Sequence, residues 1–285
     1  MRGEYRHHWV RRFLTKVVCL WNLTPRGKRL KVADYPMEFA DLPEELDGLR
    51  IVQVSDLHGR LFGENQCRLV NVVKEQEPDV ILLTGDMMEE IYEDGERRAV
   101  QLLYQELPKI APCYAILGNH EMRSRRYMSE ILSDISCSRV RLLRNESVWL
   151  GKLRLSGLET EWASGLKKED VDVDGVEKDL KQMFPEEPQD FTILMAHKPE
   201  HIELYAKFGV DLVFSGHAHG GLIKLGSPRW ALLAPGQGVF PKYIQGVYEK
   251  EHTKMVVSQG LGGPRIEIMP EIVVVELKKM ETEGV

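Results

Sequence analysis

The 285-residue chain has few cysteines, and their spacing argues against a fold held together by disulfides. Four occur, namely Cys19, Cys67, Cys113 and Cys137, and no two of them form a C-x-x-C pair. A chain of this length with 43% hydrophobic residues can bury a sizeable core without covalent cross-links. We therefore expect reduced thiols, a reducing compartment and a cytoplasmic protein.

Two catalytic signatures are missing as well. The sequence contains neither a G-x-S-x-G elbow nor a G-x-x-x-x-G-K-[ST] loop, so it lacks the motifs on which serine-hydrolase and P-loop mechanisms depend. The glycine-rich run from Gly260 to Gly263 is followed by Pro264 at the point where a nucleotide-binding helix would have to begin. We interpret this run as a turn that lies near the functional site.

Metal-binding side chains follow five hydrophobic runs. Each run has the composition of a buried parallel strand. The runs are Leu49 to Val54, Val80 to Leu83, Tyr114 to Leu117, Phe191 to Met195 and Leu212 to Phe214. The side chains that follow them are Asp56, His58, Asp86, Asn119, His197, His217 and His219. Because open α/β sheets bind ligands beyond the carboxyl ends of their strands, we expect these seven residues to converge.

Two Asp, one Asn and four His suit manganese, iron or zinc better than magnesium or calcium, which prefer shells made of oxygen alone. Seven ligands are too many for one tetrahedral site. If one carboxylate bridges, they fit two metals about 3.5–4 Å apart, the arrangement used in many phosphoryl-transfer sites. The pattern predicts a hydrolase with two divalent transition-metal ions, with manganese ahead of iron or zinc.

The motif order D-x-H, G-D, G-N-H-[DE], H and G-H-x-H resembles that of the calcineurin-like metallophosphoesterases, from Leu49 to Leu277. The resemblance implies that His120 is the acid that assists the leaving group and that a metal-bridging hydroxide is the nucleophile. The implied first metal takes Asp56, His58, Asp86 and His219. The implied second metal takes Asp86 as the bridge, with Asn119, His197 and His217.

One position departs from the family pattern. In the phosphatase branch of the family, a second Asp after the G-D motif orients the acid histidine, whereas here the segment from Gly85 offers Glu89. We assign Glu89 as a catalytic residue that orients His120.

The step His197-Lys198-Pro199 and the compact chain most resemble the bacterial membrane-associated branch of the family, which is similar to UDP-2,3-diacylglucosamine pyrophosphatase-type enzymes. This resemblance implies a small phosphodiester or diphosphate substrate, lipid-linked or nucleotide in nature. The alternatives are a nuclease or a phosphomonoesterase of the same superfamily, or a non-catalytic scaffold on this fold.

Charge is distributed unevenly along the chain. Residues 1–32 carry nine Lys or Arg and one acid, a net charge of +8, so the rest of the chain carries about −14. The acidic body disfavours binding of a phosphate backbone, and we expect no nucleic-acid partner. We divide the chain into a basic amphipathic segment, 1–32, and a metallophosphoesterase domain, 33–285.

The stretch from Trp9 to Asn22 has the spacing of an amphipathic helix. Large apolar side chains such as Trp9 and Phe13 share one half, and Arg12 and Lys16 lie on the other. The stretch is too short and too charged to span a bilayer, and it suits the surface of an anionic membrane, such as the inner face of the cell membrane. Alternatively, the helix packs on the protein body, serves as a targeting peptide or binds nucleic acid.

Helical periodicity is expected at 65–75, 96–106, 125–135, 168–183 and 200–208. The segments near 222–225, 246–248, 255–258 and 272–277 are expected to form a second, largely antiparallel sheet. Together these elements predict the α/β class and a four-layer α/β/β/α sandwich, as the family has.

Overall fold

The computed structural model describes residues 29–159, 173–222, 231–263, 265 and 268–280. Its first sheet has six strands in the order β1-β14-β2-β3-β4-β5. The bounds are β1 (Lys31–Phe39), β14 (Glu271–Lys279), β2 (Arg50–Val54), β3 (Val80–Thr84), β4 (Cys113–Ile116) and β5 (Arg141–Leu142). Strands β2 to β5 run parallel, whereas β14 is antiparallel to β2 and parallel to β1.

The second sheet also has six strands, in the order β12-β13-β9-β8-β7-β6. The bounds are β12 (Gly246–Lys250), β13 (Thr253–Val257), β9 (Leu212–Ser215), β8 (Phe191–Ala196), β7 (Leu153–Leu158) and β6 (Glu146–Leu150). The four inner strands are parallel and the two edge strands are antiparallel to their neighbours. A short hairpin, β10 (Leu233–Ala234) and β11 (Gly238–Val239), stands apart from both sheets.

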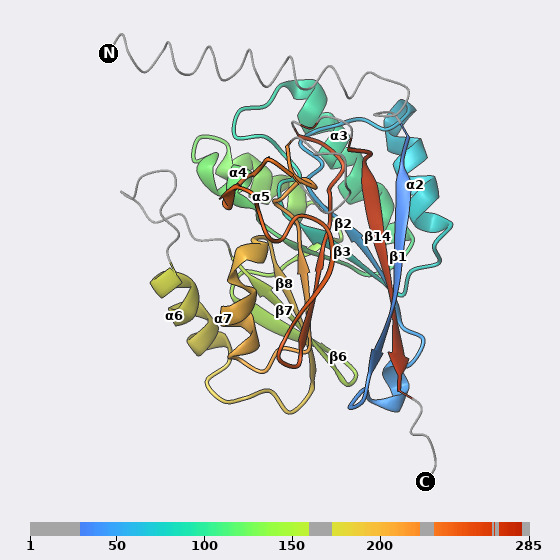
Figure 1. The fold of residues 1–285 in the computed structure, drawn as a ribbon. Coiled ribbons are helices and arrows are strands. Elements are labelled where there is room, and N and C mark those ends of the chain that lie inside the picture. The colour runs from blue at the N-terminus through green and yellow to red at the C-terminus, as the bar shows by residue number, and fades with distance from the viewer. Residues whose placement is uncertain (1–28, 160–172, 223–230, 264, 266–267, 281–285) are drawn as a thin grey trace.

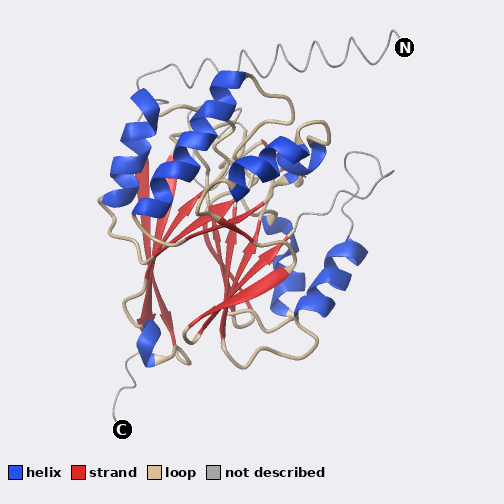
Figure 2. Ribbon diagram, turned by 180° about the vertical axis from the view of Figure 1, so that it is seen from behind, coloured by secondary structure: helices blue, strands red, loops and turns tan. Residues whose placement is uncertain are grey.

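Helices cover the outer face of each sheet, so the chain forms the predicted α/β/β/α sandwich (Figures 1 and 2). Helices α2 and α3 pack on the first sheet with α5, and α6 and α7 pack on the second. The bounds are α2 (Cys67–Lys74), α3 (Asp94–Glu106), α4 (Asn119–Arg123), α5 (Met128–Ser136), α6 (Val173–Met183) and α7 (Ile202–Ala206). The part of the predicted 168–183 helix before Val173 lies outside the described residues.

The inner strands are apolar on both faces because each face meets another layer. In β3, Leu82 packs between the two sheets, while Ile81 and Leu83 face the helices of the first sheet. Phe214 of β9 is fully buried between the sheets. This two-sided burial is the reason these strands appear in the sequence as continuous hydrophobic runs.

The composition of the second sheet differs from the prediction. It is mostly parallel, because β8 and β9 belong to it rather than to the sheet of β2, β3 and β4. The predicted strand at 272–277 is β14, which lies inside the first sheet. Strands β1, β6 and β7 were not predicted, and most of the 222–225 segment lies outside the described residues.

Three further observations concern the cysteines, membrane crossing and the domain boundary. The three described cysteines, Cys67, Cys113 and Cys137, are free thiols. Among the described residues, no helix has the length and apolar character needed to cross a membrane. The strand β1 begins at Lys31, two residues before the domain boundary placed from the sequence.

The contact between the two sheets provides the first test. Phe214→Ala should lower the free energy of unfolding by about 3–5 kcal/mol, because a fully buried ring would leave a cavity that the flanking sheets cannot close. Phe240→Ala is the matched control, since that side chain is 68% exposed and should change stability by about 0.5 kcal/mol or less. Urea denaturation measures both values, and equal losses would contradict the two-sheet core.

Candidate metal centre

The seven candidate ligands gather where strands of both sheets end. Strands β2, β3 and β4 lead into the residues from the first sheet, and β8 and β9 lead into those from the second. All seven side chains are buried, with exposed fractions of 7% or less, although most are polar or charged. They are Asp56, His58, Asp86, Asn119, His197, His217 and His219.

Six of these residues form two groups whose ligand atoms lie within 4.8 Å of one another. The first group is Asp56, His58 and His219, and the second is Asp86, His197 and His217. The groups correspond to the two halves of the site that the family pattern implies.

The backbone is strained at this edge. Asp56, His58, Asp86, His217 and His219 all adopt left-handed conformations, with φ between 50° and 66°. Each costs about 1–2 kcal/mol for a residue with a Cβ atom. Strain of this kind persists where surrounding contacts fix the backbone, and it is typical of functional sites.

Glycines allow the loops to approach the two carboxylates. A side chain at Gly118 would overlap the Asp86 carboxylate, and one at Gly216 would overlap that of Asp56. The glycine in the G-N-H-E motif and the one in the G-H-A-H motif are therefore needed for close packing against these two acids.

Backbone and hydroxyl donors hold both carboxylates in place. The His217 amide donates to Asp56 Oδ1 at 3.0 Å, and Ser55 Oγ donates to Asp56 Oδ2 at 2.6 Å. The His120 amide donates to Asp86 Oδ1 at 2.8 Å. Asp86 Oδ2 is left facing the imidazoles, 3.2 Å from His197 Nε2 and 4.0 Å from His120 Nε2.

Glu121 ties the loops after β3 and β4 together. Its Oε2 accepts hydrogen bonds from the Asp86 and Gly118 amides, and its Oε1 accepts one from the Met88 amide, all at 2.9 Å. The side chain is buried, and burial raises the pKa of its carboxyl group. Glu121, the last residue of the G-N-H-E motif, therefore holds the two loops of the site in place.

The tautomer of His197 is fixed by the strand beside it. Its Nδ1 lies 2.7 Å from the Thr84 carbonyl oxygen, which can only accept a hydrogen bond, so Nδ1 carries the proton. Nε2, the nitrogen that remains for a metal, then faces Asp86 Oδ2. A backbone carbonyl partner of this kind is usual behind a metal-bound histidine.

Several polar atoms of the site are buried without a hydrogen-bond partner, among them His58 Nε2, Asn119 Oδ1 and His217 Nδ1. A buried polar atom left unpaired is costly unless something else satisfies it. Lone pairs of imidazole and amide groups beside carboxylates are suitable ligands for divalent transition metals. The residues present therefore fit such cations.

The electrostatics around Asp86 favour positive charge. Burial alone would lower the pKa of His197, but the Asp86 and Asp56 carboxylates raise it to about 9. Burial alone would raise the pKa of Asp86, but the facing His197 and His120 imidazoles hold it well below its usual range. Burial dominates elsewhere in the set: it raises the pKa of Asp56 and lowers the pKa of His217 and of His219. The Asp86 carboxylate, which keeps its negative charge while buried, therefore suits a cation site.

His120 stands next to the ligands and is partly accessible, with 25% of its side chain exposed. Glu89 lies between two histidines, with Oε2 2.9 Å from His120 Nδ1 and Oε1 2.9 Å from His58 Nδ1. Burial alone would raise the pKa of Glu89, but His58 and His120 lower it far below the usual range. The sequence suggested the contact with His120 and missed the one with His58.

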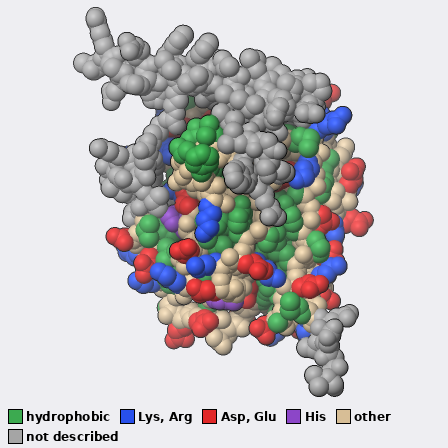
Figure 3. Space-filling view, in the orientation of Figure 1, with side chains coloured by type: hydrophobic (Ala, Val, Ile, Leu, Met, Phe, Trp, Pro, Cys, Tyr) green, Lys and Arg blue, Asp and Glu red, His purple; other side chains and the backbone are tan. Residues whose placement is uncertain are grey.

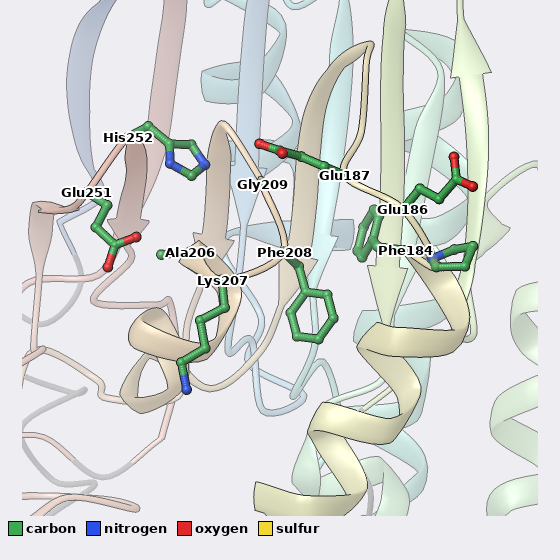
Figure 4. Close-up of a pocket in the computed structure, with 10 residues that line it drawn as sticks. Phe184, Glu186, Glu187, Ala206, Lys207, Phe208, Gly209, Glu251 and His252 are labelled. Carbon is green, nitrogen blue, oxygen red and sulfur yellow. The ribbon is translucent and has the colours of Figure 1, made fainter.

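The glycine-rich run interpreted as a turn lies against the ligands. A Cβ on Gly260 would lie 2.6 Å from Asp56 Cβ, and one on Gly263 would lie 2.7 Å from His219 Cε1. A separate pocket of about 410 Å³ is found beyond the amino ends of β8 and β9, between Glu187, Lys207 and His252 (Figure 4). The pocket therefore lies at the other end of the second sheet and takes no part in the metal-binding edge.

The calcineurin-like phosphoesterase family model matches residues 49–221. A metallophosphoesterase of Aquifex aeolicus is 30% identical over 87% of this chain and 92% of its own length. A zebrafish transmembrane protein with a metallophosphoesterase domain is 29% identical over 91% of this chain and 59% of its own length. A metallophosphoesterase of Helicobacter pylori is 31% identical, and the chain likewise spans 59% of its length.

The crystal structure of a Thermus thermophilus protein, TT1561, has a similar fold. It superposes with a TM-score of 0.50 at 14% sequence identity, covering 74% of this chain and 89% of that one. Such a likeness concerns the fold alone, whereas the family model spans all five ligand-bearing segments of the sequence. The chain therefore belongs to the calcineurin-like phosphoesterase family, and its domain is that of a metal-dependent phosphoester hydrolase.

Proposed function

We propose that this chain hydrolyses a phosphodiester or diphosphate bond in a substrate that carries a lipid part, at a centre of two divalent transition-metal ions. The observation that carries the proposal is the pair of buried ligand groups, one of which contains Asp86, with His120 beside it. Asp86 would be the ligand that two ions share: its Oδ1 is held by the His120 amide, while its Oδ2 faces the His197 imidazole.

Two divalent cations held here would supply Lewis acidity. They would polarise a phosphoryl group and lower the pKa of a nearby water, so that it loses a proton and can attack at neutral pH. The protein supplies the fixed geometry. Thr84 and Ser55 orient His197 and Asp56, and Glu121 fixes the loop that carries Asp86. The ligands are therefore arranged before any substrate binds, which reduces the reorganisation needed during reaction.

His120 is the proposed general acid. With Nδ1 facing Glu89, its Nε2 faces the ligand edge and can donate a proton to the oxygen of the leaving group. The contact between the Glu89 carboxylate and Nδ1 holds the ring in this orientation. Because Glu89 also contacts His58, one carboxylate couples the acid to a metal ligand.

Exposed apolar side chains near the same edge support a lipid part in the substrate. Leu61 and Ile91 follow the loops that carry His58 and Glu89, and they are 54% and 60% exposed. Val239 and Phe240, 60% and 68% exposed, belong to the hairpin that places Gly236 beside His217. Exposed apolar groups gathered near a site are typical of an apolar ligand or a membrane surface.

A nuclease is the nearest rival within the family. On the face shown in Figure 3, the described acidic and basic side chains are intermingled and form no basic stripe. Nucleic-acid binding relies on such a stripe. A screen of the Mn²⁺-loaded protein against phosphomonoesters, phosphodiesters, nucleotide-diphospho-lipids and DNA distinguishes these substrates, and no turnover of any of them would favour a scaffold.

The metal assignment leads to the second prediction. The purified protein should hold close to two transition-metal ions, and Asp86→Asn should lower the metal content more than Asn119→Ala, because the bridging carboxylate contacts both ions. Elemental analysis measures the content, with Asp41→Asn as an exposed control. Full metal content in Asp86→Asn would refute the bridge.

The third prediction separates proton transfer from metal binding. His120→Asn should lower kcat for alkyl phosphodiesters by about 10²–10⁴-fold with normal metal content, since general-acid catalysis contributes about that much. The loss should be smaller for p-nitrophenyl esters, whose leaving group needs less protonation. Glu89→Gln should give a smaller loss in kcat and shift the pH profile. Steady-state kinetics on both ester types decide, and equal losses would remove His120 as the acid.

The fourth prediction concerns membrane attachment through the basic segment from Trp9 to Asn22, which lies outside the described residues. Each Lys or Arg near an anionic bilayer contributes about 1 kcal/mol, an attraction that salt screens. The protein should therefore bind anionic liposomes and release them at high salt.

Deletion of residues 1–24 should abolish liposome binding and leave hydrolysis of a soluble aryl phosphodiester unchanged, because every proposed site residue lies after Leu49. Sedimentation with liposomes and a colorimetric assay measure the two quantities. A truncated protein that is insoluble or inactive would mean that the segment packs on the body instead.

A further inference from the structure

Glu200 is a half-buried acid with a buried carboxylate, and the proposed reaction does not use it. It lies in the 3₁₀ turn Pro199–His201, between the ligand His197 and helix α7. Both carboxylate oxygens are buried, and neither has a hydrogen-bond partner. An unpaired carboxylate at such a position costs stability, so its presence calls for a function.

The hairpin of β10 and β11 brings this carboxylate to a metal ligand. Gly236 in its turn adopts φ +73°, and a Cβ added to it would lie 2.5 Å from Glu200 Oε1 and 2.9 Å from His217 Nε2. The carboxylate oxygen and the imidazole nitrogen thus border the same small space, which stays open because residue 236 has no side chain. The other ring nitrogen, His217 Nδ1, is buried without a hydrogen-bond partner.

The neighbouring ligands show what such a pairing achieves. His197 Nδ1 contacts the Thr84 carbonyl oxygen, and His58 Nδ1 lies 2.9 Å from Glu89. In both rings the contact on one nitrogen leaves the other free to bind a metal. A metal-bound histidine commonly donates its second N–H to a carboxylate or carbonyl, which fixes the tautomer and strengthens the ligand.

We propose that Glu200 is a positioning residue of the metal centre: when a cation binds His217 Nδ1, the Glu200 carboxylate would accept a hydrogen bond from His217 Nε2–H in the space beside Gly236 and so keep Nδ1 unprotonated for the metal. The proposal rests on the metal centre described under the proposed function. Glu200 itself contacts no reacting atom. Its effect is on the affinity for the ion on the side of His217.

The test is a calorimetric titration of the chelator-stripped protein with Mn²⁺. Glu200→Ala should weaken the binding of one of the two ions by about 10–100-fold, the usual effect of removing such a partner. Glu200→Gln keeps an oxygen acceptor of the same reach and should lose less. Glu203→Gln on α7 is the control, because the Glu203 side chain is 63% exposed, and it should bind Mn²⁺ as the wild type does.

Thermal melting of the stripped variants provides the second measurement. Loss of an unpaired buried carboxylate should leave the melting temperature equal or higher, while the affinity for Mn²⁺ falls. A lower melting temperature together with the affinity loss would make Glu200 a support of the fold and overturn the proposal.

The titration of the wild type distinguishes failure of the proposed metal centre from failure of the proposed role of Glu200. A wild-type protein that binds no Mn²⁺ would overturn the metal centre itself. Unchanged affinity in Glu200→Ala, beside a wild type that binds two ions, would overturn only the role of Glu200.

Discussion

The burial of two carboxylates at the junction of two sheets is the constraint that the rest of the structure serves. Asp56 and Asp86 are 0% and 1% exposed, and a charge removed from water in this way costs several kcal/mol unless donors and cations surround it. The amides of His217 and His120 donate hydrogen bonds to the two acids, and imidazoles surround them. The strained loops and the motif glycines follow from the same requirement, because only close backbone approach places those amides on the acids.

The ligand set could be predicted from the sequence because each ligand segment directly follows a buried run. The position of a strand end is a local property, and in an α/β fold it is sufficient to gather the side chains at one edge. The hydrogen bond from the Gln53 side chain of β2 to the Ser215 carbonyl oxygen, at the end of β9, joins the two sheets beside the site, and no local pattern indicates it. The roles of the site residues remain predictions until the variants are measured.

Sheet membership could not be predicted in the same way. Phe191–Ala196 and Val80–Thr84 are both buried on two faces, so their sequences look alike although they belong to different sheets. The distinction depends on pairing over long sequence separations, such as Val213 of β9 with Met255 of β13. Strand β1 was missed for another reason. It contains Pro36, which argues against a central strand and is tolerated here because β1 is at the edge of its sheet.

Three glutamates show why contacts made behind the candidate ligands are hard to predict from the sequence. Glu89 lies in a loop, Glu121 in the short helix α4 and Glu200 in the 3₁₀ turn Pro199–His201, and an acid in such a segment is usually solvated. Here each carboxylate lies at the site, near an imidazole ring or a backbone amide of another segment. The longer glutamate side chain can span from one strand end to the next, and only the three-dimensional arrangement reveals which partner it reaches.

The position of β14 has a consequence for the order in which the chain can assemble. Among the described residues, the first strand, β1, pairs with the last, β14, which stands between β1 and β2. During synthesis on a ribosome, every ligand from Asp56 to His219 emerges before β14 does. The open edge of β2 is meanwhile available to pair with other strands. Strand β1 therefore has no partner in the first sheet until β14 is made, so this sheet is completed only after every candidate ligand has been synthesised.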